Sequence, residues 1–251
     1  LTAMADDLGF SYDSDGDGQA ENYWREGAQL TLADLPTEVP EGYVISYTVT
    51  QTTDGTDITG NALNGTTLTV PYADVTVTMT LTAIPWSGTG TENDPWVIIY
   101  PSQLDLLAQR VNSGTGDDDA ATGYKGKYFV LGADIAYRHA EQEGGEYESN
   151  YTAIGNGNTF CGNFDGRGHT VSGIRIYMGS GCQGLFGQSG GNIRGITLAD
   201  ARITGYIYYD SSLGGIVGAN SGTVSDCHVA ATVTIRAYLN HYYSYKLGGI
   251  V

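Results

Sequence analysis

The sequence predicts an all-β protein: a small antiparallel β-sandwich followed by a parallel β-solenoid, a coil of short strands stacked in rungs. Composition supports this, because 37 glycines among 251 residues and only 16% charged residues form a turn-rich profile that few helices tolerate. The apolar runs are short, rich in Val and Ile, and bounded by Gly, Asn, Ser and Asp, as strands are. Between Phe160 and Val229 such runs recur with the same internal spacing, which indicates stacked repeats.

Charge divides the chain into two expected domains, residues 1–85 and 86–251. The first contains 13 acidic residues and one basic residue, whereas the second contains 15 acidic and ten basic residues. This break places the boundary near Pro85. The total net charge of −17 argues against nucleic acid as a partner.

An acidic segment opens the chain. Asp13, Asp15 and Asp17 resemble the first half of a calcium loop, which uses carboxylates at positions 1, 3 and 5. Trp24 occupies position 12, where such a loop needs a bidentate glutamate. The alternatives are a calcium site on these three aspartates and a solvated acidic turn. The missing glutamate favours the turn, and no other cofactor is expected.

The rest of the first domain alternates as strands do. Four segments carry the pattern, separated by turn signals: 29–32, 43–49, 66–70 and 75–83. The last is strictly alternating, with Val75, Val77, Met79 and Leu81 on one face and threonines on the other. The pattern predicts a small sandwich of immunoglobulin-like type, for which we expect a spacer role.

A linker-like stretch, residues 86–95, precedes a strand at 96–100 and one helix at 102–112. Ser102 with Asp105 has the pattern of a capping box, and Gly114 follows the helix as a stop signal. The residues at helical spacing on one face are Leu104, Leu107, Ala108 and Val111. We expect this helix to cap the open hydrophobic end of the solenoid.

The repeats themselves are three apolar triplets that share one internal spacing. They are Val171-Ile174-Ile176, Ile193-Ile196-Leu198 and Val224-Cys227-Val229. A shorter offset separates the first two triplets and a longer one the last two, which predicts two successive rungs, the longer with an outward loop. Equivalent side chains should then stack into internal columns, so Cys227 is expected to be a small buried hydrophobe rather than half of a disulfide.

At these residues the chain also resembles a known family. GLFGQSGGNIRGITL and GGIVGANSGTVSDCHV are similar to the GLUG-type repeat of bacterial surface proteins, and FCGNFDGRGHTVSGIRI is similar to the rung that precedes such repeats. The resemblance covers residues 88 to 251. It implies a right-handed parallel β-helix in an extracellular or cell-surface bacterial protein, and it implies no catalytic residues.

Tyrosines gather in two segments that occupy matching places in successive rungs, with Tyr206 in one equivalent to Tyr238 in the next. The candidate ligand-binding residues are Tyr206, Tyr208, Tyr209, Tyr238, Tyr242, Tyr243 and Tyr245. Tyrosine combines a flat apolar face with a hydroxyl, which suits a glycan or a cell-surface protein partner. The alternative is that these side chains pack on one another along the coil.

No catalytic pattern is recognisable. Hydrolysis of a glycan needs two carboxylates about 5 to 10 Å apart. The spacings between Asp165, Asp200 and Asp226 match neither rung offset. The four histidines lack metal-ligand spacing. We therefore expect a non-catalytic, adhesin-like or scaffold protein. The alternative is a carbohydrate-active enzyme or carbohydrate-binding module on the same scaffold.

The two ends of the chain carry further expectations. No signal peptide and no membrane-spanning run is recognisable in the sequence. The last residues, Gly249 to Val251, read as the start of another repeat. We expect either a fragment of a longer array or head-to-tail self-association at this open end.

Overall fold

The computed structural model describes residues 2–3, 10–12, 21–23, 26–32, 39–138, 148–207, 211–239 and 246–250. Within them the protein is mostly β, with both antiparallel and parallel sheets, in agreement with the predicted all-β class. The chain divides into two compact units, Leu1–Ala83 and Ile84–Val251. Each unit is described by itself.

The first unit contains short antiparallel strands. One sheet has the order β1-β4-β7-β6, and two further pairs are β2-β3 and β5-β8. The strands are β1 (Thr2–Ala3), β2 (Phe10–Tyr12), β3 (Glu21–Tyr23), β4 (Gln29–Thr31), β5 (Tyr43–Gln51), β6 (Leu63–Asn64), β7 (Thr67–Thr69) and β8 (Val75–Ala83). One short helix, α1 (Thr59–Ala62), lies between β5 and β6.

The core of the first unit follows the predicted alternation in part. Val49 pairs with Val77 in the antiparallel β5–β8 pair, and both belong to a cluster built around Leu30, Leu32 and Leu68. The threonines between the apolar residues of β8 are exposed, as the period of two requires. The later apolar residues of β8 are exposed as well, so only its first half contributes to this core.

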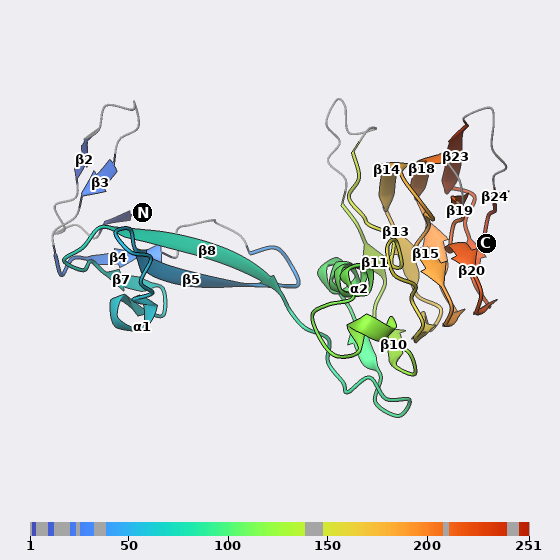
Figure 1. Ribbon diagram of the computed structural model, residues 1–251, viewed down its shortest axis with the longest axis horizontal. Helices are drawn as coiled ribbons and strands as arrows, with labels where there is room; N and C mark the ends of the chain where they lie inside the picture. The colour runs from blue at the N-terminus through green and yellow to red at the C-terminus, as the bar shows by residue number, and fades with distance from the viewer. Residues whose placement is uncertain are drawn as a thin grey trace. The chain divides into compact units, whose positions relative to one another are not determined.

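The second unit is built from parallel strands that recur in the same order along the chain (Figure 1). Its first sheet contains β9 (Trp96–Ile98), β10 (Tyr128–Leu131), β12 (Asn163–Asp165), β16 (Asn192–Arg194) and β21 (Thr223–Ser225). The second contains β11 (Ile135–Ala136), β13 (Thr170–Ser172), β17 (Thr197–Ala199) and β22 (His228–Val229). The third contains β14 (Arg175–Gly179), β18 (Arg202–Ile207) and β23 (Thr234–Leu239).

Two shorter parallel pairs complete the unit. They are β15 (Phe186–Ser189) with β20 (Val217–Asn220), and β19 (Ser212–Leu213) with β24 (Lys246–Leu247). Successive strands of the chain therefore visit the sheets in turn. The first sheet contains five strands, the second four and the third three, so the early passes of the chain contribute to fewer sheets than the later ones.

The register of the paired strands confirms one of the two predicted offsets between the triplets and contradicts the other. The longer offset is confirmed, because Ile193 pairs with Val224 and Leu198 pairs with Val229. The shorter offset is wrong. Val171 pairs with Leu198 rather than with Ile193, and the partner of Ile193 is Phe164.

The error has a simple physical cause. The triplet Val171-Ile174-Ile176 crosses the corner between β13 and β14, whereas Ile193-Ile196-Leu198 crosses the corner between β16 and β17. Two different turns between strands share one apolar spacing. Ile174, Ile196 and Cys227 therefore do not form one column. The strand register places Cys227 opposite Ile196, whereas the residue opposite Ile174 is Ala201.

The glycines that follow Phe186 and Val217 mark a place where neighbouring passes of the chain come close. Phe186 pairs with Val217, and both side chains are fully buried. A Cβ atom at the adjacent Gly187 would lie 2.5 Å from the Cys182 carbonyl oxygen, and one at Gly218 would lie 2.7 Å from that of Gln183. Only glycine fits at these positions.

Helix α2 (Pro101–Ser113) packs its apolar face into the same core as the strands, with Leu104, Leu107 and Val111 fully buried. It lies at the end of the stack near β10 and β11, away from β23 (Figure 1). Gly114 ends it in the left-handed conformation, with φ of 66°, as predicted.

The predicted capping box of the helix is wrong. Gln103 fills the role, because its Oε1 accepts hydrogen bonds from the backbone N–H groups of Ile99 (2.8 Å) and Tyr100 (3.2 Å). Ser102 is buried instead, and Asp105 accepts a hydrogen bond from the Tyr137 hydroxyl at 2.7 Å.

The core thins toward the last strands. Ile193 and Leu198 are at most 1% exposed, whereas their partners Val224 and Val229 are only half-buried. Within the described residues no further strand pairs with β21, β22 or β23. The inner face of the final pass is therefore partly open.

Candidate binding site

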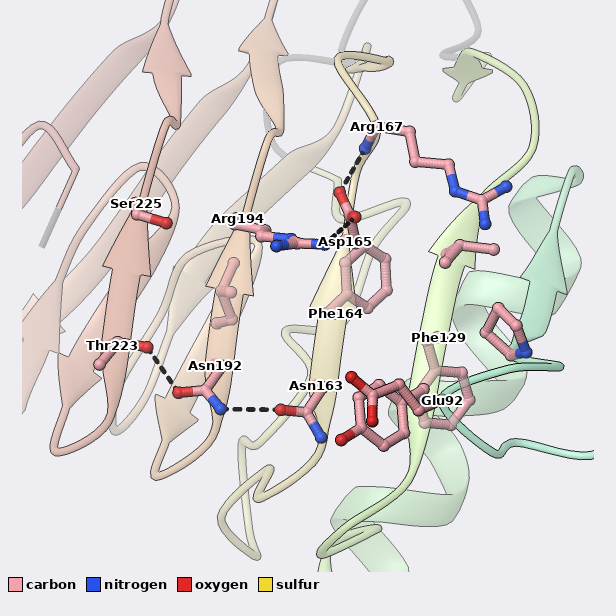
Figure 2. A pocket seen from close by; sticks show the side chains of 14 residues that line it. Glu92, Phe129, Asn163, Phe164, Asp165, Arg167, Asn192, Arg194, Thr223 and Ser225 are labelled. Carbon is pink, nitrogen blue, oxygen red and sulfur yellow. Dashed lines mark hydrogen bonds and ion pairs between the residues drawn. The ribbon is translucent and has the colours of Figure 1, made fainter.

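A groove of about 470 Å³ runs over the outer face of the first parallel sheet (Figure 2). Its floor consists of side chains from four strands that are neighbours in this sheet, β10, β12, β16 and β21. The lining residues are Glu92, Pro95, Tyr128, Phe129, Val130, Asn163, Phe164, Asp165, Arg167, Asn192, Ile193, Arg194, Thr223 and Ser225.

Strand register builds this floor. On each strand the middle residue points into the core, as Phe129, Phe164 and Ile193 do. Its two neighbours then point outward, because side chains alternate along a strand. The outward positions fall into two rows across the sheet: Tyr128, Asn163, Asn192 and Thr223, and Val130, Asp165, Arg194 and Ser225.

From Thr223 to Asn163 the first row is a continuous chain of hydrogen bonds. The Thr223 hydroxyl donates to Asn192 Oδ1 at 2.5 Å, and Asn192 Nδ2 donates to Asn163 Oδ1 at 2.7 Å. Asn163 Nδ2 then donates to the Lys127 carbonyl oxygen at 3.2 Å. That carbonyl can only accept, so it fixes the orientation of both amides. Figure 2 shows the row lying across the strands.

The second row is centred on an ion pair. Arg194 Nη2 lies 2.7 Å from Asp165 Oδ2, and the Arg167 backbone N–H donates to Asp165 Oδ1 at 2.8 Å. Burial alone would raise the pKa of Asp165, but these two hydrogen bonds outweigh it and hold the pKa below the usual value. The Arg194 side chain is 65% exposed, so most of its N–H groups face the groove or solvent.

The chemistry of the groove is therefore that of a polar surface with little net charge. Its two acids, Glu92 and Asp165, are matched by Arg167 and Arg194. Within the described residues the hydroxyls of Tyr128 and Ser225 make no hydrogen bond, so both are available to a ligand.

The presence of two carboxylates in one groove is not sufficient for hydrolysis of a glycan. One of them must carry a proton at working pH in order to act as the general acid. Asp165 is held in the ionised form by its partners, and burial does not protect a proton on it. Asp200 lies elsewhere, 3.2 Å from Arg175 Nη2, so the three aspartates considered from the sequence do not converge.

The structure places only part of the predicted tyrosine site. Tyr206 and Tyr238 are paired in register on β18 and β23, in agreement with the predicted equivalence, and the Tyr238 side chain is 37% exposed. The other five candidates lie outside the described residues: Tyr208, Tyr209, Tyr242, Tyr243 and Tyr245.

The predicted metal ligands Asp13, Asp15 and Asp17 also lie outside the described residues. In the part of the chain that the structure describes, no group of three His, Cys, Asp or Glu side chains could hold a metal ion. Cys161, Cys182 and Cys227, all within the described residues, form no disulfide. Cys227 is half-buried, less than the predicted column required, and burial raises its pKa.

Sequence reasoning missed the groove, although a signal was present. Asn163 and Asn192 each precede an inward apolar residue at the start of a strand, and Thr223 does the same one rung later. An alignment of the rungs by strand rather than by apolar triplet would have brought the three polar positions together.

Comparisons with known proteins give one similarity. The chain is 29% identical over 160 residues to halomucin of Haloquadratum walsbyi, an alignment that covers 61% of this chain. It spans about 2% of the length of that relative. No family model matches the chain, and no solved structure matches it.

Proposed function

We propose that this protein is a non-catalytic, adhesin-like module of a cell surface. Its second unit would be a right-handed parallel β-helix with GLUG-type repeats that presents its faces to a glycan or a protein partner. The observation that carries the proposal is the register of the outward side chains, which repeat from strand to strand across four strands of one sheet. A surface so built suits recognition of an extended partner.

The surface location is supported by the similarity to halomucin, which is compatible with a cell-surface protein. Within the described residues no helix is long and apolar enough to cross a membrane. The first unit, an immunoglobulin-like sandwich in this proposal, would act as a spacer. Its own core around Leu30, Leu32 and Leu68 supports an independent module.

The second unit offers two candidate contact surfaces. One is the polar groove over β10, β12, β16 and β21. The other is the tyrosine surface near β18 and β23, of which Tyr238 is the exposed and described member. Tyrosines at the surface favour binding because a rigid aromatic ring loses little entropy when it is ordered.

The second candidate function, a carbohydrate-active enzyme, is favoured by one observation: Glu92 and Asp165 line the same groove. An enzyme would release reducing sugar from soluble glycans, and Glu92→Gln would abolish that release. The proposed binding module releases none, and Glu92→Gln leaves its binding of intact glycan measurable.

A glycan array probed with the full chain tests the proposed function. We expect specific binding by the wild type. A variant with alanine at Tyr208, Tyr238, Tyr242 and Tyr243 then distinguishes the two surfaces. Loss of binding places the contact on the tyrosine surface, and retained binding places it elsewhere. A wild type that binds neither glycans nor extracellular proteins would contradict the proposal.

A further inference from the structure

We infer that the groove binds a linear, uncharged glycan chain that lies along the stack, across β10, β12, β16 and β21. This inference rests on the proposed function and specifies its ligand class, its site and its direction of binding.

The first argument is periodicity. Neighbouring strands of a sheet are about 4.8 Å apart, so the groove presents an equivalent polar group at that interval. Asn163, Asn192 and Thr223 occupy three consecutive positions of this kind. The interval is comparable with the length of one sugar ring, so a chain of sugars running across the strands places successive rings over successive side chains. A chain running along a strand would meet only one member of the row.

The second argument is the hydrogen-bonding capacity that remains in the row. An amide group has two N–H donors and two acceptor lone pairs. In the row, Asn192 uses one N–H toward Asn163 and one lone pair toward Thr223, and Asn163 uses its own groups in the same way. Each side chain keeps one donor and one acceptor. Sugar hydroxyls are both donors and acceptors, and they match such pairs.

The third argument is rigidity. Because Asn163 and Asn192 are already held by the row, they lose little conformational freedom when a ligand binds. Polarisation along a chain of hydrogen bonds also strengthens the free donors. The row therefore resembles a preorganised site more than a set of mobile surface amides.

The fourth argument is charge. The groove's two carboxylates and two guanidinium groups balance, and Arg194 is committed to Asp165. The chain as a whole carries a net charge of −17, which repels polyanions such as sulfated or uronic-acid glycans. The lining has no excess of negative charge that would favour a cationic partner, since Arg167 and Arg194 balance Glu92 and Asp165. An uncharged chain is the partner that fits.

One end of the row adds an aromatic group. Tyr128 pairs in register with Asn163, and both line the groove. An aromatic ring beside hydrogen-bonding amides suits the apolar face and polar rim of a sugar ring. Tyr128 therefore defines the subsite at the β10 end, and Thr223 the subsite at the β21 end.

Titration calorimetry on the full chain tests the inference, with uncharged linear oligosaccharides of two to eight sugars selected from the array. For the wild type we expect affinity to rise with length up to about four sugars, one per strand, and then to level off. Raising the salt concentration from about 50 to 500 mM should change affinity less than twofold, because no ion pair forms.

Asn192→Ala removes the centre of the row and should weaken binding at least tenfold. Asn192→Thr, which supplies a hydroxyl in place of the amide on a strand-forming residue, should recover part of that loss relative to Asn192→Ala. Thr197→Ala is the matched control. Thr197 is an outward residue on β17 outside the groove, and its substitution should leave affinity within twofold. Urea midpoints equal to that of the wild type show that each of the three variants is folded.

Several results would overturn the inference. If the wild type binds glycan and Asn192→Ala binds equally well, the groove is not the site although the proposed function stands. Preference for charged glycans, with strong salt dependence, would refute the uncharged ligand. Binding of an extended peptide but no glycan would refute the ligand class. A wild type that binds no ligand of any kind would contradict the proposed function as well.

Discussion

Gly191→Ala is expected to destabilise the second unit, and the reason lies in a column of glycines beneath the groove. Gly162, Gly191 and Gly222 each precede the first residue of a strand of the first sheet. A Cβ atom at Gly191 would overlap the carbonyl oxygen of Gly162, and one at Gly222 would overlap that of Gly191. Each glycine therefore makes room for the backbone of the preceding rung.

The size of the effect follows from that overlap. Real Cβ contacts are not shorter than 3.0 Å. The Gly162 carbonyl must therefore move away, and the hydrogen bond it accepts from the Asn192 N–H at 3.0 Å is lost or strained. Such a bond contributes about 1 kcal/mol, and overpacking costs about 1 to 3 kcal/mol. The alanine also reduces the entropy of the unfolded chain, which raises the free energy of unfolding by about 0.7 kcal/mol and offsets part of the loss. We expect a net loss of about 2 kcal/mol.

Urea unfolding of the full chain, followed by tryptophan fluorescence, measures this loss. Trp86 and Trp96 report on the second unit, because both lie in its aromatic cluster with ring centroids 5.4 Å apart. Gly249→Ala is the control: nothing lies within 4 Å of its added Cβ, so we expect a change below about 0.5 kcal/mol. If Gly191→Ala were as stable as that control, the close stacking of the rungs would be refuted.

Three further predictions concern the core and its thiols. Burial raises the pKa of Asp105 to about 6, above its unfolded value near 3.9, so its ionisation weakens the fold as pH rises through about 4 to 6. Asp105→Asn should therefore add about 2 to 3 kcal/mol to the free energy of unfolding at pH 7.5 and little at pH 4; an equal gain at both would contradict this assignment. Leu198→Ala should cost about 3 kcal/mol and Val229→Ala about 1 kcal/mol in urea unfolding, because Leu198 is fully buried and Val229 half-buried; equal costs would show that the core does not thin toward the last strands. In native thiol labelling Cys182, at 4% exposed, should react slowest of the three cysteines, and labelling of Cys182 as fast as in urea would contradict its burial.

Much of the second unit could be predicted because its signal is local and repetitive. Val and Ile in short runs specify strands, and Leu104, Leu107 and Val111 specify the helix face. The rung from Ile193 to Val224 was found at its correct length because both passes turn the first corner with the same number of residues. The corner after Phe164 is longer, so the preceding rung was misaligned.

The candidate groove could not be predicted from the same signals. Asn, Thr and Ser are common in turns, and their positions carry no apolar periodicity. Asn163 and Asn192 come together only when the inward residues Phe164 and Ile193 are paired, and that pairing joins an aromatic residue to an aliphatic one. Likewise Gln103 rather than Ser102 caps the helix, because the helix begins at Pro101 and Ser102 already lies within its first turn.

The order β9-β10-β12-β16-β21 also determines how the second unit would respond to a pulling force. Tension applied across the stack, from β9 toward β21, loads the contacts between successive strands in series. Every contact in such a series bears the same force, so the weakest one opens first and the others open one at a time. Such a unit would lengthen in steps of one rung. Each rung would dissipate mechanical work as it opens, which would limit the force transmitted between the two ends of the unit.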